Sequence, residues 1–575
     1  MHIKKNEEMW NEVFHAHRQY SPNCSGFLKW DQNAERPWGL VWQEQAICDK
    51  CSYRSSYYKL YEEVATNRPG RRAARPNVGV HVGLSQTPIS TSSFQKILLA
   101  LNTPAPSTSG MQKSANKVCP KLETINKADM KRLRSEIKKK KNKQSQEVCA
   151  IDIQSDGMYN NPLYSGVGKT PFQPATNCVY TVVENETDQK KVIALATKNK
   201  LCSKGHHLKK RDLDGQGVGC SGTDHQCTAN IPFEKSIGDE YSWSKECLLQ
   251  LKEDNLEVKH VTTDPDSSAH RAAEDLYNEG TTETEPESLL DTRHMSENHR
   301  KYIKNHIGLT DLMPGKTKAN RTKLQNRFAI DLAERCQTEF NCAHTQLAGD
   351  YEKIKSALSY TSDAMILCYH GEHASCKKHS YVCKGAKKNW IQKSSYLAPD
   401  FKVKQTSDSA SVLLDCINWR FNPATLYRTR HNSNTQKAEA VNRCLRRSLP
   451  KNVTFSRNFP GRAHSAIHSV NHGTAESITT LCNEIGAPVT KGSRVESQLK
   501  ARTVKESEIK AYQKSEKFKQ ARKRRRTEVY QLYEKHQEQI IYQKNVVLPQ
   551  MTPGTSKTDH SYSKVKKTRS VSRRK

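Results

Sequence analysis

The sequence predicts a mixed α/β protein in which strands in the middle of the chain form one sheet and a long helical block is inserted before the chain returns to it. Residues 148–153, 178–183 and 191–197 alternate apolar and polar side chains, which is typical of strands. An amphipathic stretch at 243–251 then leads to another alternating run at 256–263. This order of strands, helix and strand favours a mixed sheet.

Composition narrows the classes of partner. The 575 residues suffice for two to four domains at roughly 100 to 200 residues each. Lys and Arg total 93 against 60 Asp and Glu, a formal charge of +33, which favours a polyanion: DNA, RNA or an anionic membrane. With no apolar run of about 18 residues and no apolar signal core at the amino terminus, we expect a soluble intracellular protein without a membrane span.

Changes in composition divide the chain into six expected regions. These are a Cys-rich zinc-ribbon-like module at 1–65, a helical basic region at 66–145, the first part of the sheet core at 146–300 with a Cys and His insertion at 201–227, a helical insertion with another Cys and His cluster at 301–430, the final part of the core at 431–487, and a basic helical and disordered tail at 488–575.

Two predicted strands stop at acidic residues. The first breaks at Asp156-Gly157 and the second at Asp264, so we expect these carboxylates at the ends of neighbouring strands. Two divalent ions about 3.5 to 4 Å apart can cleave a phosphodiester where three or four carboxylates converge, and Mg²⁺ (or Mn²⁺) suits oxygen ligands. Glu439, on a predicted amphipathic helix, is the best third acid.

Other interpretations of these acids remain open. Asp followed by Gly is first of all a turn signal, and Asp264-Pro-Asp266 is an ordinary way to begin a helix. Asp152 and Asp266 are rival ligands, because each lies close in sequence to a favoured acid.

Cysteine and histidine gather in three clusters that approach the four ligands of structural Zn²⁺. Cys48 and Cys51 form a half-site, but only Cys24 is available as a further thiol, with His15 or His17 as the fourth ligand, which suggests a truncated module. A second cluster holds Cys202, His206 or His207, Cys220, His225 and Cys227, and a third holds Cys368, His370, His373, Cys376, His379 and Cys383. A single Cys is more often a small buried hydrophobe, so only the clusters indicate zinc.

Basic residues follow Glu439 closely and predict a surface that binds DNA phosphates. They are Arg443, Arg446, Arg447, Lys451 and Arg457. The later run from Lys517 to Arg526 is interpreted as a nuclear localisation signal, a DNA contact or a solvated helix face.

Taken together, several short motifs resemble the Mutator-like transposase domain found in many animal mobile elements. The resemblance runs from about Cys24 to Pro460. Its carriers are Asp156-Gly157-Met158-Tyr159-Asn160-Asn161, the segment 201–230, Thr263-Asp264-Pro265-Asp266, the segment 291–300, His373-Ala-Ser-Cys376 and Glu439-Ala-Val-Asn442.

The resemblance implies an RNase H-like core whose catalytic triad is Asp156, Asp264 and Glu439, with a helical insertion between the last two. It further implies a DNA transposase that performs metal-dependent strand cleavage and strand transfer at transposon ends. The partners would be double-stranded DNA of the terminal repeats and the target. We also expect a homo-oligomer in the nucleus.

The same family carries a Cys or Asp, two residues, then His motif, which Asp291 and His294 match in the Asp form. We assign these two residues, with Asp266 and Asn442, to support of the site. A domesticated or decayed transposase that binds DNA without cutting it is the main alternative. An RNA-binding zinc-knuckle protein would explain the charge, but not the paired acidic strands.

Overall fold

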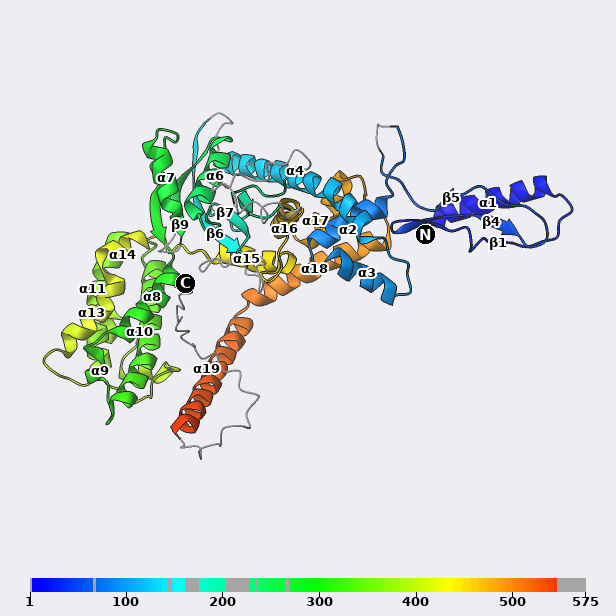
Figure 1. Cartoon of the computed structure of the whole chain (residues 1–575). Coiled ribbons are helices and arrows are strands. Elements are labelled where there is room, and N and C mark those ends of the chain that lie inside the picture. The colour runs from blue at the N-terminus through cyan, green and yellow to red at the C-terminus, as the bar shows by residue number, and fades with distance from the viewer. Residues whose placement is uncertain are drawn as a thin grey trace, which may run out of the picture. The chain divides into compact units, whose positions relative to one another are not determined.

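In the computed structural model, the described residues are 3–65, 69–141, 147–160, 175–202, 227–232, 235–263 and 268–545. Contacts divide the chain into two units, Met1–Lys505 and Glu506–Lys575. The first unit holds a mixed sheet with many helices, so the expected mixed α/β class is confirmed (Figure 1). No helix among the described residues is long and apolar enough to cross a membrane.

The amino-terminal part combines one helix with short strands. The elements are α1 (Ile3–Tyr20), β1 (Leu28–Trp30), β2 (Arg36–Trp38), β3 (Val41–Glu44), β4 (Ala46–Cys48) and β5 (Tyr58–Lys59). β1 pairs with β4, and β3 pairs with both β2 and β5, all antiparallel. The apolar face of α1 packs on this part through Met9 and Val13.

Three helices precede the sheet: α2 (Arg75–Ser85), α3 (Thr91–Ala100) and α4 (Thr108–Lys140). Ser90 and Ser107 cap α3 and α4, because each side-chain oxygen accepts a hydrogen bond from a backbone N–H in the first turn. The lysine-rich last turn of α4 places positive charge at the negative end of the helix dipole.

Five strands form the central sheet. They are β6 (Cys149–Tyr159), β7 (Asn177–Glu184), β8 (Val192–Asn199), β9 (Leu256–Thr263) and β10 (Glu287–Leu290). The order across the sheet is β10-β9-β6-β7-β8. β6, β7 and β8 are antiparallel neighbours, whereas β9 and β10 run parallel to β6.

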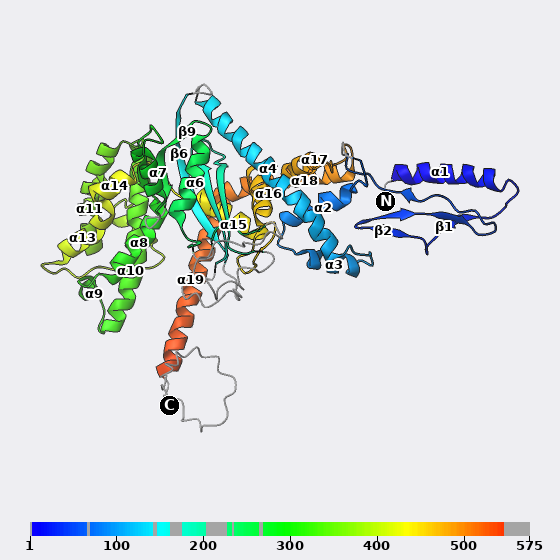
Figure 2. The ribbon, with the colours of Figure 1, turned by 45° about the horizontal axis from the view of Figure 1, so that its top comes forward.

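Helices cover both faces of this sheet (Figures 1 and 2). α6 (Glu240–Lys252) and α7 (Ala269–Asn278) pack on the face that contains Ile151 and Ile153. α15 (Gln436–Ser448) and α16 (Phe459–His472) pack on the opposite face, against Met158 and Val179. Alternate residues of β6 therefore point to two different helical layers.

Side chains from three helices form hydrogen bonds with backbone groups of the edge strand β8. Arg134 of α4 donates to Ile193 O at 2.7 Å. Asn471 of α16 both accepts from Val192 N and donates to Val192 O, each at 2.9 Å. Gln250 of α6 donates to Leu195 O at 3.1 Å. These contacts cover an edge that would otherwise be open to another strand.

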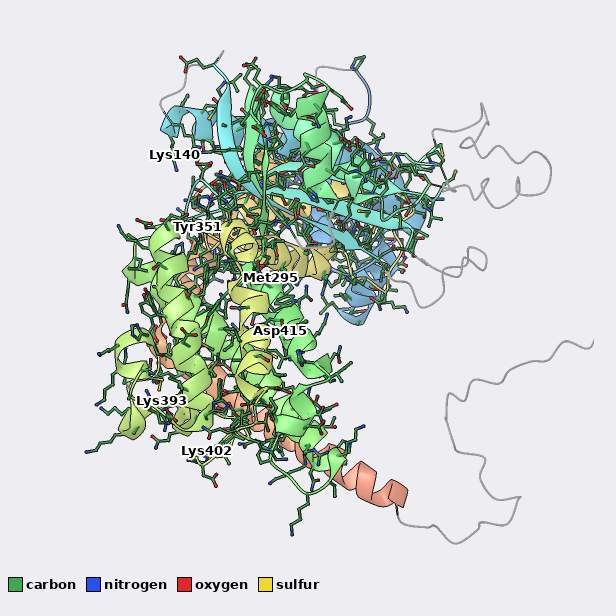
Figure 3. All side chains as sticks on the ribbon, turned by 90° about the vertical axis from the view of Figure 1, so that its left-hand side faces the viewer. Lys140, Met295, Tyr351, Lys393, Lys402 and Asp415 are labelled. Carbon is green, nitrogen blue, oxygen red and sulfur yellow. The ribbon has the colours of Figure 1, made fainter. Side chains whose placement is uncertain are left out.

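Along the chain, a block of helices follows β10 and precedes α15. Figure 3 shows it around the labelled Tyr351, Lys393, Lys402 and Asp415. It contains α8 (Thr292–Asn305), α9 (Leu309–Leu312), α10 (Lys318–Gln346), α11 (Tyr351–His370), α12 (Cys376–His379), α13 (Ser409–Phe421) and α14 (Pro423–Arg428). Its apolar core is separate from the two layers of the sheet.

The chain continues through α17 (Thr474–Glu484), α18 (Arg494–Lys514) and α19 (Glu516–Asn545). α18 has no buried residue, and the basic run from Lys517 to Arg526 lies on α19 with all its Lys and Arg side chains exposed.

Gly461 of α16 sits where that helix crosses α4. A Cβ added there would overlap the backbone carbonyl of Cys119. Gly83 of α2 has open space around the same position. We therefore predict that Gly461→Ala lowers the free energy of unfolding by about 1 to 3 kcal/mol, whereas Gly83→Ala raises it by up to about 1 kcal/mol. Urea unfolding of the full chain, followed by circular dichroism, measures both. A stability gain in both variants would contradict this close crossing.

Candidate functional site

Asp156 lies inside β6, not at its end. The strand was expected to stop at Asp156, but it runs on to Tyr159 because β7 pairs with it from Ile153 to Tyr159, with Asp156 opposite Thr181. The pairing of β6 with β9 ends earlier, at Gln154 opposite Thr262. Pairing with β7 therefore prevails over the turn preference of Asp156-Gly157. Asp156 lies two residues beyond Gln154, the last residue of β6 that pairs with β9.

Gln154 fixes the start of α15 on this strand. Its side-chain oxygen accepts hydrogen bonds from the backbone N–H groups of Lys437 and Ala438, at 3.1 and 3.0 Å. Its amide nitrogen donates to Asn185 Oδ1 at 2.6 Å. Gln154 is fully buried, so these bonds are needed to offset the cost of removing its amide from water. Gln154 was not among the site residues predicted from the sequence, although a Gln within an otherwise apolar strand indicates a buried polar contact.

Asn442 joins α15 to Asp156. Asn442 Nδ2 donates a hydrogen bond to Asp156 Oδ2 at 2.8 Å. The other side-chain atom, Asn442 Oδ1, is buried and has no hydrogen-bond partner within the described ranges. Glu439 lies three residues earlier on the same helix, so its side chain shares a face with Asn442. The helix thereby carries Glu439 close to Asp156.

Asp291 ties the beginnings of α8 and α15 together. Its Oδ1 caps α8 by accepting from the backbone N–H groups of Arg293 and His294, at 2.6 and 3.2 Å. Its Oδ2 accepts from Thr435 N at 2.8 Å. His294 Nε2 then lies 3.2 Å from Glu439 Oε1, and Arg293 Nη1 lies 3.3 Å from Glu439 Oε2. Asp291 is fully buried, which suits a structural role.

The carboxyl ends of β9 and β10 are side by side, with Thr263 opposite Leu290. Asp291 follows β10 directly. Asp264 and Asp266 follow β9 in the sequence and lie outside the described residues.

Asp152 belongs to a different network. Its Oδ1 lies 2.6 Å from His260 Nδ1, and His260 Nε2 lies 3.5 Å from Glu287. Burial would raise the pKa of Asp152, but His260 and the charge of Lys141 outweigh it and lower that pKa below its ordinary value. Asp152 is four residues from Asp156 along the strand, about 13 Å at the usual rise per residue.

The basic residues that follow Glu439 are exposed along α15 and the segment after it: Arg443, Arg446, Arg447, Lys451 and Arg457. Burial and repulsion by Arg446 lower the pKa of Lys451, and attraction by Asp156 opposes this shift. Positive charge therefore lies beside both acids, from Lys451 near Asp156 and from Arg443 3.8 Å from Glu439, and exposed charge of this kind suits phosphate binding.

The amino-terminal part holds one complete set of metal-ligand atoms. Atoms of His17, Cys24, Cys48 and Cys51 all lie within 4.8 Å of one another. Cys51 Sγ is 3.3 Å from His17 Nε2, and Cys24 Sγ is 3.6 Å from Cys48 Sγ. One imidazole nitrogen and three thiol sulfurs at such separations fit tetrahedral zinc. The sequence left the fourth ligand open between His15 and His17, and it is His17 that lies with the three cysteines, so these four residues could hold a metal ion.

A pattern in the sequence distinguishes His17 from His15 as the candidate fourth ligand. Met9, Val13 and His17 are spaced by four residues, so they share the buried face of α1, whereas His15 is exposed. The helical period alone therefore points His17 toward the cysteines.

A second complete set lies at the end of α11. Its ligand atoms are within 4.8 Å of one another and come from Cys368, His373, Cys376 and Cys383. His379, an alternative ligand by sequence, stacks on Tyr360 instead, with ring centroids 5.4 Å apart. His370 is not part of the set.

A buried arginine beside this second set supports metal binding. Arg335 is fully buried next to Cys368. Its guanidinium nitrogens have no hydrogen-bond partner among the described residues, and Nε lies 3.7 Å from Glu339 Oε1. Zinc with three thiolates and a neutral imidazole is a net anion, so Arg335 would neutralise it inside the protein.

The third cluster falls largely outside the described residues, which exclude His206, His207, Cys220 and His225. Cys202 and Cys227 are described and flank that segment. Asn199 Nδ2 donates to Leu201 O at 2.9 Å and to Thr228 O at 2.8 Å, so the two ends of the segment meet at β8.

The family model for the Mutator-like transposase matches residues 1–383, more than half of the chain. This chain belongs to the Mutator-like transposase family. Membership indicates a transposase, a class that binds DNA and has nuclease and transferase activity. The match includes Asp156, Asp291 and His294 and ends at Cys383, so Glu439 lies beyond it. No curated protein matches the chain.

The amino-terminal ligand set of this transposase gives a direct test. We predict that His17→Gln lowers the zinc content of the purified full chain by about one equivalent, because structural zinc sites are closed by four protein ligands and glutamine is a poor one. His15→Gln is the matched control and should retain the zinc of the unsubstituted chain. Mass spectrometric metal analysis measures both. Equal zinc in the two variants would rule out His17 as a ligand.

Proposed function

We propose that the chain is a DNA transposase that cleaves DNA strands at the ends of its element and joins them to target DNA, using two Mg²⁺ or Mn²⁺ ions held by Asp156, Asp264 and Glu439. The partners would be terminal-repeat and target duplexes. A homo-oligomer would hold two ends together. The basic run on α19 would direct the protein to the nucleus, and Zn²⁺ in the Cys and His sets would be structural.

The sheet supports an RNase H-like core. Three antiparallel strands in sequence, then two strands parallel to the first, with the first strand at the centre, define the observed order. Helices on both faces and a helical block before α15 complete the arrangement that the family resemblance implies.

One observation carries the proposal: the hydrogen bond between Asn442 and Asp156. It joins residues 286 positions apart in sequence. It also docks the helix of Glu439 against the strand of Asp156. The third acid, Asp264, follows directly after Thr263, the last residue of the strand that lies next to β6. Asp156 and the helix of Glu439 thus meet at the sheet, and the proposal adds Asp264 to them from its place in the sequence after β9.

The donor set fits hard cations. Mg²⁺ and Mn²⁺ prefer oxygen ligands. Asn442 Oδ1 is a buried oxygen without a partner among the described atoms, on the side chain that contacts Asp156. When bound, such ions activate an attacking oxygen and stabilise the leaving oxygen of a phosphodiester.

The protein's own residues would position this chemistry. Arg293 and His294 hold the two oxygens of Glu439, and Asn442 orients Asp156. The exposed basic residues of α15 would bind DNA phosphates beside the acids. Water would attack first to free a 3′-hydroxyl, and that hydroxyl would then attack a target phosphodiester, with the departing 3′ oxygen taking up the proton.

We predict that Asp156→Asn abolishes cleavage while DNA affinity stays equal or rises slightly, because a negative charge near the phosphates is lost. The assay incubates the full chain and Mg²⁺ or Mn²⁺ with duplexes taken from either side of its gene. Asp188→Asn, in the exposed turn between β7 and β8, is the matched control and should cleave normally.

Metal-dependent nicking that survives Asp156→Asn would overturn the assignment of this acid. If the unsubstituted chain binds these duplexes but never cuts or joins them, the chain is a transposase-derived DNA-binding protein instead.

We predict that Asp152→Asn retains cleavage but lowers stability at neutral pH by less than about 1 kcal/mol, because the Asp152 side chain is 43% exposed. The folded pKa of Asp152 is lowered, so its contribution is present above the unfolded pKa and disappears as pH falls through the folded pKa. Urea unfolding between pH 7 and acid pH should show the two proteins converging. Loss of cleavage in this variant would make Asp152 the metal ligand.

A further inference from the structure

A cluster of ligand atoms lies outside the proposed active site and contains no cysteine. It is formed by Asp129 of α4 with His468 and His472 of α16, whose ligand atoms lie within 4.8 Å of one another. His468 is buried, and the side chains of Asp129 and His472 are 10% and 6% exposed. The two histidines are one helical turn apart, so they share one face of α16.

Each histidine has one ring nitrogen held by α17. His472 Nδ1 lies 3.3 Å from Glu476 Oε1, and His468 Nδ1 lies 2.9 Å from Ser477 Oγ. Nε2 is the remaining ring nitrogen of each histidine, and that of His472 contacts Asp129 within the same cluster. Metal-bound histidines have the same arrangement, with the second nitrogen fixed by a carboxylate or another polar group.

The carboxylate is oriented in the same manner. Arg132 Nη2 donates to Asp129 Oδ1 at 2.6 Å, and Asp129 Oδ2 lies 2.6 Å from His472 Nε2. One oxygen is therefore fixed by an arginine while the other faces the histidines. Glu476 is 65% exposed, so the cluster lies near the surface, where an ion can enter.

We propose that Asp129, His468 and His472 form a divalent transition-metal site of the zinc class, with water as the fourth ligand. Two imidazoles and one carboxylate suit this ion. Tetrahedral bonds of about 2.0 to 2.2 Å separate ligand atoms by about 3.3 to 3.6 Å. Small side-chain movements would bring the three ligand atoms to these separations. With an ion on Nε2, the single N–H of the neutral His472 ring is on Nδ1, where Glu476 can accept it.

The site joins parts of the chain that are distant in sequence. Asp129 and His472 are 343 positions apart. The ion would clamp α4, which precedes the sheet, to α16, which packs against α15 and the sheet. It would therefore stabilise the layer that carries Glu439, without contacting substrate. This inference stands apart from the proposed function, because it concerns metal content rather than catalysis.

The test measures zinc bound to the purified full chain after equilibration with Zn²⁺ and dialysis. We expect His472→Gln and His468→Gln each to lose about one equivalent, since glutamine keeps a hydrogen bond but is a poor zinc ligand. His464→Gln is the matched control: His464 is buried one turn earlier on α16, but its ring bonds Asn126 rather than a carboxylate. His472→Cys should keep the equivalent, because a thiolate is a zinc ligand.

A second measurement needs no variant. A chelator added stepwise to the unsubstituted chain should remove one equivalent of zinc before any cysteine becomes reactive to a thiol reagent, because this site has no thiolate. Unchanged zinc in both glutamine variants, or release of every equivalent together with new reactive thiols, would overturn the proposal and leave a purely hydrogen-bonded cluster.

Discussion

The docking of α15 on β6 is the constraint on which the rest of the site depends. Gln154 and Asp156 project from the same face of the strand, and both bind the helix, through its first N–H groups and through Asn442. Gln154 is fully buried, so any register shift between strand and helix would leave its amide without partners in a medium where that is costly. The hydrogen bonds of Gln154 and Asp156, and not apolar packing alone, thus determine where α15 places Glu439.

Buried polar side chains also determine how the neighbouring helices are placed, because each needs a polar partner. Asp291 bonds the first turns of α8 and α15, so the helical block begins where the site helix begins. Arg335 is buried beside a Cys and His set, where an anionic zinc centre would balance its charge. Glu339, one turn away on α10, is the charged group nearest to Arg335, at 3.7 Å, whereas the partners of Asp291 and Gln154 come from distant segments.

Some of the residues that form the fold and the site could be predicted from the sequence, and others could not. The strands and their acids were visible in alternation, and Cys24, Cys48, Cys51, His373, Cys376 and Cys383 were visible in their spacing. The choice of His17 was within reach through the period of α1. Asp156 was misplaced at a strand end, because local turn propensity carries no information about β7, whose pairing extends the strand. Asp264 falls outside the described residues, so its position stays a prediction.

The sequence by itself determined the mixed α/β class, the basic surface, the family and the candidate acids, because periodicity, charge and motif residues are local properties of the chain. Only the tertiary structure decided which side chains meet: Asn442 with Asp156, His294 with Glu439, and Asp129 with two histidines of α16. These contacts join segments more than a hundred residues apart. Their geometry follows from strand pairing and helix packing, which no local pattern encodes.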